Sequence, residues 1–191
     1  MRYSTEHKEE TRRRIVQAAG ALAKKQGFGT TGVDGLMGAA GLKGSTFYHH
    51  FDTKNDLLGK IIEAELETTR ERYAGARNGS KRDLLKQTLA YMTVQHVDTP
   101  EDGCVLPTLS AEIARSSEDV KKSYEDAMKR IQGDLKKVIG DDSTTWALLA
   151  LSVGAVTMAR AMASEKSRDD VLKACSKFAK QTFAALEEAE D

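Results

Sequence analysis

Apolar residues recur every three to four positions along most of the chain, which is the period of an α-helix. In the N-terminal segment this apolar stripe consists of Ile15, Ala18, Ala19, Leu22 and Ala23. We therefore expect a first helix from about Thr5 or Thr11 to Gln26, ended by Gly27. No segment alternates convincingly between apolar and polar residues, so the pattern predicts an all-α protein.

Three further helical patterns follow in the N-terminal part. A second, short helix is expected over about residues 32–40, with Thr31 as its cap. A third, very short helix is expected over about residues 44–50. A fourth, long helix begins near Lys54 and runs toward Ala76, and its apolar face consists of Leu57, Leu58, Ile61, Ile62 and Leu66.

The rest of the chain carries more helical patterns, separated by breaks rich in Gly, Asp and Pro. We expect helices at about 81–97, 103–115, 117–139, 143–164 and 167–188. The breaks fall at Asn78-Gly79, 98–103 and 140–143. Pro100 and Pro107 bracket the sequence EDGCVLP, which we expect to be a loop leading into the next helix.

The third short helix combines apolar anchors with an unusual number of polar side chains. On a wheel of about 100° per residue, Phe47 and Phe51 share one face, which we expect to be buried. The opposite face and the flanks carry hydroxyl and imidazole groups, from Ser45, Thr46, Tyr48 and His49. His50 borders the buried side, so we expect it to have a structural role.

The second and third helices are joined by the tight turn Gly41-Leu42-Lys43, which matches a helix-turn-helix. In that motif the second helix enters the major groove of DNA, where hydroxyl groups can bond base edges or phosphates. The formal net charge of the chain is zero, but residues 1–60 hold ten basic and six acidic residues. Positive charge is thus concentrated in the segment that carries the motif.

The same segment carries a family resemblance. The matching residues are Gly27-Phe28, Thr31, Val33, Leu36, Ala39-Ala40-Gly41-Leu42, Ser45-Thr46-Phe47-Tyr48, His50-Phe51, Thr53-Lys54 and Leu57-Leu58. They resemble the N-terminal signature of the TetR family, and the match covers about residues 11–58 at fixed spacing. The resemblance implies a homodimeric transcriptional repressor that is released from a palindromic operator by a small-molecule effector.

The resemblance also implies a division of the chain. We expect a helix-turn-helix DNA-binding domain at residues 1–57, joined by the long helix to a helical effector-binding and dimerisation domain at residues 58–191. The partner would be double-stranded DNA. The residues expected to touch it are Thr31, Lys43, Ser45, Thr46, Tyr48, His49 and, at a phosphate, Lys54.

Two features depart from the family pattern. The turn reads Leu42-Lys43-Gly44-Ser45 where the family commonly has Val-Ser-Lys-Gly, so the basic residue is displaced by one position. The second helix also contains Gly32, Gly35 and Gly38. Each interior Gly costs about 0.5–1 kcal/mol relative to Ala, so we expect this helix to be only marginally stable away from DNA.

The last two long helices are expected to form the dimer, because in the family they build a four-helix bundle. Small residues in the first of these helices would allow close approach of a partner helix. The interface candidates are Ala150, Gly154, Met158, Phe178 and Phe183.

Two triggers for release remain open. Polar groups on otherwise apolar helices could line an effector pocket, and the candidates are Tyr91, Gln95, His96, Tyr124 and Trp146. The alternative is oxidation or alkylation of Cys104, because residues 103–119 resemble the corresponding segment of TetR-family members that sense reactive electrophiles. The alternative interpretation, which we favour for Cys104, is an inert, small apolar residue at the start of a helix.

Other classes of protein find little support. The chain lacks a Gly-rich phosphate loop, an HExxH motif and a nucleophile elbow, so we do not expect an enzyme. Cys104 and Cys175 lack metal-ligand spacing, and we expect neither a metal nor a cofactor. The apolar run 146–159 is too short to span a bilayer and no signal peptide is apparent, which favours the cytoplasm. A helical adaptor with a vestigial helix-turn-helix is the other reading.

Overall fold

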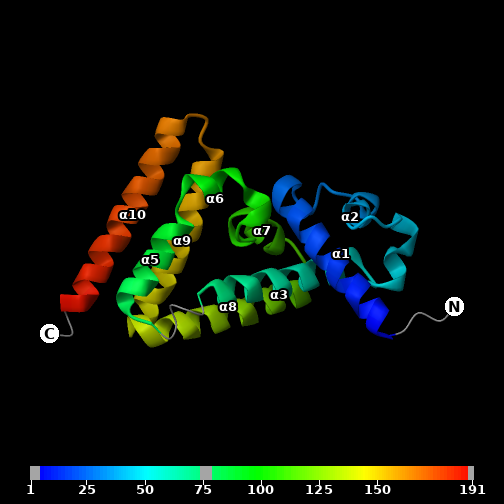
Figure 1. Ribbon diagram of the computed structural model, residues 1–191, viewed down its shortest axis with the longest axis horizontal. Coiled ribbons are helices and arrows are strands. Elements are labelled where there is room, and N and C mark those ends of the chain that lie inside the picture. The colour runs from blue at the N-terminus through cyan, green and yellow to red at the C-terminus, as the bar shows by residue number, and fades with distance from the viewer. Residues whose placement is uncertain (1–4, 74–78, 189–191) are drawn as a thin grey trace. The chain divides into compact units, whose positions relative to one another are not determined.

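The computed structural model describes residues 5–73 and 79–188, and these residues form helices and no strand (Figure 1). The prediction of an all-α protein is thereby confirmed. In chain order the elements are α1 (Thr5–Gln26), α2 (Val33–Ala39), the 3-10 helix η1 (Gly44–His49), α3 (Lys54–Arg72), α5 (Lys81–Tyr91), α6 (Val94–Asp98), η2 (Pro100–Asp102), α7 (Leu106–Ile113), α8 (Glu118–Ile139), α9 (Asp142–Ala161) and α10 (Glu165–Glu188).

Most predicted boundaries agree with these elements. The first helix begins at Thr5, and its end at Gly27 is confirmed. Gly27, Gly41 and Gly140 have φ angles of 85°, 70° and 87°, so each follows a helix in the left-handed conformation that favours glycine. The predicted end of the fourth helix near Ala76 lies outside the described residues, as does Asn78.

Other predictions about single elements were wrong. Thr31 does not cap α2: the capping position is Gly32, and the Thr31 hydroxyl donates to the Gly27 carbonyl instead. The helix expected at 81–97 is two helices, because Thr93 starts a new one by accepting a hydrogen bond from the His96 N–H. The helix expected from 103 begins only at Leu106, which places Pro107 in its first turn, where proline is tolerated.

The described chain divides into two compact units. The first contains Met1–Glu67 and Pro100–Ala127, and the second contains Thr68–Thr99 and Met128–Asp191. The two units are defined by packing contacts and not by function. They therefore do not test the predicted functional boundary after residue 57, which stays a prediction.

In the first unit, α2 and η1 lie together on one side of α1 (Figure 1). The amphipathic stripe of α1 faces inward as its spacing predicted, because Ile15, Ala19 and Ala23 are fully buried. Large, fully buried side chains of this core include Leu36, Met37, Phe47, Phe51, Leu57 and Ile61. Burial of this apolar surface is the main force that holds the short helices α2 and η1 in place.

In the second unit, α10 packs against α9 and α5 (Figure 1). Its core includes Leu84, Leu148, Val156, Leu172 and Phe183. α9 is long and apolar enough to pass as a membrane span by length and composition, although only a third of that apolar window is buried. Thr145 and Ser152 on α9 are buried, and each hydroxyl donates to the carbonyl four residues earlier, as in a core helix.

Candidate nucleic-acid interface

Two aromatic side chains anchor η1 to the first unit. Phe47 and Phe51 are 0% and 1% exposed, and their ring centroids lie 5.6 Å apart. Tyr48, between them in the sequence, is 73% exposed and meets the Phe47 ring edge-on at 5.2 Å. The predicted inward and outward faces are therefore confirmed, although the element is a 3-10 helix with about three residues per turn.

The outward surface of η1 carries four different polar groups. Ser45, Tyr48 and His49 are exposed, and so is Lys43, which precedes the helix in an extended conformation. The Thr46 hydroxyl donates to the Lys43 carbonyl at 2.7 Å, so it is committed to holding the start of the helix. The surface offers an ammonium group, a hydroxyl, a phenol and an imidazole, which are groups that bond phosphates and base edges.

Thr31 and Lys54 hold the turn between α1 and α2. The Thr31 hydroxyl donates to the Gly27 carbonyl at 2.7 Å. The Lys54 ammonium donates to the carbonyls of Phe28, at 2.8 Å, and Gly29, at 3.4 Å, and lies 4.7 Å from the centre of the Phe28 ring. Both residues thus have a structural role within the chain, and their contacts with DNA stay predictions.

His50 lies at the edge of the same core. Its ring lies 6.4 Å from that of Phe51, and its buried Nδ1 atom has no hydrogen-bond partner within the part of the chain that the structure describes. Burial lowers the pKa of His50, and the nearby positive charges of Lys8, His49 and Arg12 lower it further. The lowered pKa favours the neutral imidazole, and the structural role of His50 stays a prediction.

One residue that matters for this region escaped the sequence analysis. Glu112, on α7, accepts hydrogen bonds from the backbone N–H groups of Phe28 and Gly29. These partners lie more than 80 residues away in the sequence, and no local pattern marks a glutamate as the partner of a distant turn. Only the tertiary structure identifies it.

The predicted effector residues fall into separate groups. Cys104 and Tyr124 belong to the first unit, whereas Tyr91, Gln95, His96 and Trp146 belong to the second. Cys104 is 1% exposed. Burial raises the pKa of Tyr124, against the opposing effect of its hydrogen bond with Ser110.

Within the second unit, Tyr91 and His96 make a close contact with each other. The rings of Tyr91 and His96 meet edge-on at 4.4 Å, and the Nδ1 atom of His96 lies 2.8 Å from the Tyr91 carbonyl oxygen. Gln95 and Trp146 are exposed. The structure therefore brings Tyr91 and His96 together and leaves Gln95 and Trp146 at the surface.

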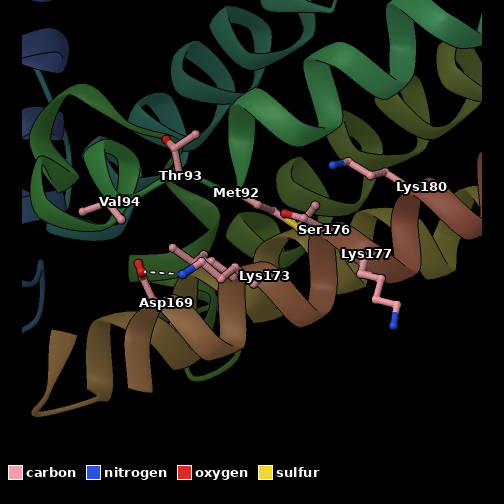
Figure 2. Close-up of a pocket in the computed structure, with 9 residues that line it drawn as sticks. Met92, Thr93, Val94, Asp169, Lys173, Ser176, Lys177 and Lys180 are labelled. Carbon is pink, nitrogen blue, oxygen red and sulfur yellow. Dashed lines mark hydrogen bonds and ion pairs between the residues drawn. The ribbon is translucent and has the colours of Figure 1, made fainter. Parts of the chain in front are cut away.

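In the described part of the second unit, two of the cavities are lined by none of the six predicted residues. The larger, of about 440 Å³, is an open groove between the α5–α6 junction and α10 (Figure 2), lined by Met92, Thr93, Val94, Asp169, Leu172, Lys173, Ser176, Lys177 and Lys180. The smaller, of about 10 Å³, is lined by Tyr73, Leu84, Thr88, Leu135, Ile139, Thr145, Leu148, Leu149 and Ser152. The smaller cavity can hold about one water molecule.

The groove combines an apolar floor with positive charge. Met92 and Leu172 are buried, while three lysines come from α10. Lys173 pairs with Asp169 at 2.9 Å, and Figure 2 shows Lys180 reaching from α10 toward α5. Such a surface suits an elongated molecule that has an apolar part and an anionic group.

Apolar residues that face solvent follow α9 and α10. On α9, Trp146, Ala150, Gly154 and Met158 are spaced four apart and are exposed or partly exposed. On α10, Phe178 is 57% exposed. Phe183, also a predicted interface residue, is only 1% exposed because it packs in the core of its own chain, which leaves little of it for a partner.

The comparisons with known proteins agree with this geometry. Residues 15–61 match the family model described as bacterial regulatory proteins, tetR family. No curated protein matched the chain. The chain is 21% identical to reduced E. coli NemR, at a TM-score of 0.72, and the match covers 91% of this chain and 97% of NemR.

Two further solved structures are similar over nearly their whole length. A TetR transcriptional regulator from Chloroflexus aurantiacus J-10-FL is 21% identical at a TM-score of 0.72, covering 93% of this chain and 98% of that one. A TetR-family regulator from Agrobacterium tumefaciens is 17% identical at a TM-score of 0.72, covering 89% and 97%. Residues 15–61 therefore carry the N-terminal helix-turn-helix domain of the TetR family of bacterial regulatory proteins, and the chain has the fold of the solved TetR-family transcriptional regulators.

Proposed function

We propose that this regulator is a repressor that reads its operator through η1. The observation that carries the proposal is the contrast between the buried anchors Phe47 and Phe51 and the exposed Tyr48 and His49. An apolar anchor fixes the backbone of η1, so little backbone freedom is lost when its polar side chains bind. Lys43 and Ser45 extend the same surface.

The test is direct. Selection from random duplex DNA should yield one palindromic sequence, and a gel shift should show the protein on the region upstream of its own coding sequence. A helical adaptor with a vestigial helix-turn-helix would select no sequence, and an enzyme would not either. In cells, deletion of the protein should raise transcription from the bound promoter if it is a repressor, whereas a fall in transcription would make it an activator.

The regulator would act as a homodimer in the cytoplasm. A single helix-turn-helix contacts too few base pairs to specify one site, and a two-fold dimer doubles the contact. The solvent-facing stripe of Trp146, Ala150, Gly154 and Met158 on α9 supports this proposal, since its apolar surface would be covered by a second copy. The small residues in the stripe would let two helices approach closely.

Release from DNA would follow from a small molecule or from chemistry at Cys104. For the first, the groove at α10 would take an anionic molecule with an apolar part. The effect should appear as a thermal shift with alkyl carboxylates and not with alkyl amines of equal length, and Lys180→Glu should remove it. For chemistry at Cys104, the related observation is that the solved E. coli NemR is a reduced form, which concerns the redox state of that protein.

A release assay on operator DNA separates these triggers. Mild electrophiles and oxidants would be added to wild type, Cys104→Ser and Cys175→Ser. Release of wild type but not of Cys104→Ser would assign the signal to Cys104. No response from wild type or Cys104→Ser would leave the small molecule as the trigger. Loss of response in Cys175→Ser alone would contradict both assignments, because the signal would then depend on Cys175, a half-buried residue of α10.

A further inference from the structure

The turn that joins α1 to α2 is held by two charged side chains of opposite sign. The carboxylate of Glu112 accepts from the N–H of Phe28, at 3.0 Å, and from that of Gly29, at 2.5 Å. The ammonium group of Lys54 bonds the carbonyls of the same two residues. Both residues of the turn, Phe28 and Gly29, are therefore fixed through their backbone N–H donors and through their carbonyl acceptors.

The local backbone explains why a carboxylate is needed there. Gly27 leaves the helical conformation with a φ of 85°, so the N–H groups that follow have no carbonyl of α1 to bond. The two oxygens of a carboxylate match two adjacent N–H groups, and hydrogen bonds to an ionised acceptor are stronger than those to a neutral one. A β-carbon on Gly27 or Gly29 would lie 3.2 Å from a Glu112 oxygen, so both glycines help to leave room for it.

Two more ties connect the segment before α7 to the end of α1. The Lys24 ammonium, on a side chain that is 5% exposed, donates to the Gly103 carbonyl at 3.0 Å and to Glu65 at 2.8 Å. Lys25 pairs with Glu101 at 3.0 Å. The segment 101–113 thus contacts the end of α1 and the following turn at several points within the first unit.

We infer that Glu112 is a positioning residue for DNA reading: it holds the turn at Phe28 and Gly29 and so sets how α2 and η1 lie against α1. α2 is only seven residues long and contains two glycines, so it has little stability of its own and takes its position from its anchors. Glu112 lies outside the matched family region 15–61, in the segment that also contains Cys104. The inference rests on the proposed reading of DNA by η1.

The test compares Glu112→Gln with Glu118→Gln in the full-length protein. The glutamine keeps the shape of the side chain but puts an NH2 donor against one of the two N–H donors. Glu118 is an exposed glutamate that pairs with Lys121, three residues away on the same helix, so it is the matched control. Glu112→Asp, which keeps the charge on a shorter side chain, is the second variant.

We expect Glu112→Gln to bind the selected operator at least roughly tenfold more weakly, since a bond to a charged group is lost. Amide hydrogen exchange at Phe28 and Gly29 should rise in the free protein, while exchange in α9 and α10 stays at wild-type rates. Glu112→Asp should recover part of the affinity, and Glu118→Gln should match wild type in both measurements.

Wild-type affinity in Glu112→Gln, with faster exchange at Phe28 and Gly29, would overturn the inference, because the turn would then be loose without consequence for DNA. Unchanged exchange at these two amides would overturn it as well. If Glu112→Gln does not fold, Glu112→Asp is the deciding variant. A folded Glu112→Asp protein with wild-type operator affinity and faster amide exchange at Phe28 and Gly29 would also overturn the inference. Failure of the wild-type protein to select any duplex would instead remove the proposed function on which it rests.

Discussion

The side chain of Asp34, on α2, occupies the space that a β-carbon on Gly44 would need at the start of η1. The Asp34 Cα atom itself would lie 3.2 Å from such a β-carbon. α2 and η1 therefore meet closely at this point, and rotation of the Asp34 side chain alone would not restore a relaxed contact. The close approach of the two helices requires glycine here.

Gly44→Ala should loosen the packing of η1 against α2. We expect a loss of about 1–3 kcal/mol in the free energy of unfolding, which is typical of an overpacked contact, and weaker operator binding. Chemical denaturation followed by circular dichroism measures the first effect, and fluorescence anisotropy with labelled operator measures the second.

Gly38→Ala is the matched control in the same motif. Nothing lies within 4 Å of a β-carbon at Gly38, and alanine favours the helical conformation. This variant should gain about 0.5–1 kcal/mol of stability. Equal destabilisation by Gly44→Ala and Gly38→Ala would mean that the contact with Asp34 has no special effect.

Tyr48→Ala and His49→Ala should weaken DNA binding and leave the fold intact. Both side chains are exposed, so their removal uncovers little of the core. If they read bases directly, each should change sequence preference by about 1–3 kcal/mol per affected base pair. Anisotropy titrations on the selected operator and on single-base variants measure the change. If both variants bind like wild type, η1 is not the reading helix.

Gly154→Leu should weaken the proposed dimer without disturbing the protomer. Among the described residues nothing lies within 4 Å of a β-carbon at Gly154, which is half-buried, so a side chain can start there without a clash at its β-carbon. On the proposed interface it would keep two helices apart and raise the dimer dissociation constant roughly ten- to hundredfold. Sedimentation velocity detects the monomer, and Gly154→Ala should remain closer to wild type. A wild-type protein that is monomeric at micromolar concentration and still binds DNA tightly would contradict the dimer.

Asp134 should make stability depend on pH in the acid range. Burial acts to raise the pKa of Asp134, but hydrogen bonds from Arg70, at 2.7 Å, and Lys137, at 3.0 Å, outweigh it and lower the pKa from 3.8 to about 2. Because the folded-state pKa is depressed, this stabilisation is fully present above a pH near 4. It is lost as the pH falls toward 2.

The measurement is the free energy of unfolding of wild type and Asp134→Asn from pH 7 to pH 2. The difference should be on the order of 2 kcal/mol at neutral pH and should shrink below pH 4. Asp126→Asn is the control, because Asp126 and Lys122 form an exposed pair 3.8 Å apart, which should contribute little. A difference between wild type and Asp134→Asn that is independent of pH would refute the assignment to ionisation.

Local sequence determined most of the helices. The three-to-four-residue period places Ile15, Ala19 and Ala23 on one face, and burial of that face needs no knowledge of the partner helix. Gly27, Gly41 and Gly140 end helices because the required backbone conformation is a property of glycine itself. The inward and outward faces of η1 followed from the same periodicity. The resemblance to the TetR family could also be found from sequence, because its signature lies in one continuous stretch.

Tertiary structure alone decided which distant groups meet. The burial of Phe183 in its own chain and the separation of Cys104 from Tyr91 into different units depend on packing between segments far apart in sequence. The same is true of Glu112 at the turn of Phe28 and Gly29. A periodic pattern records which side of a helix is apolar, but the partner of a single carboxylate depends on where the folded backbone brings two unpaired N–H groups.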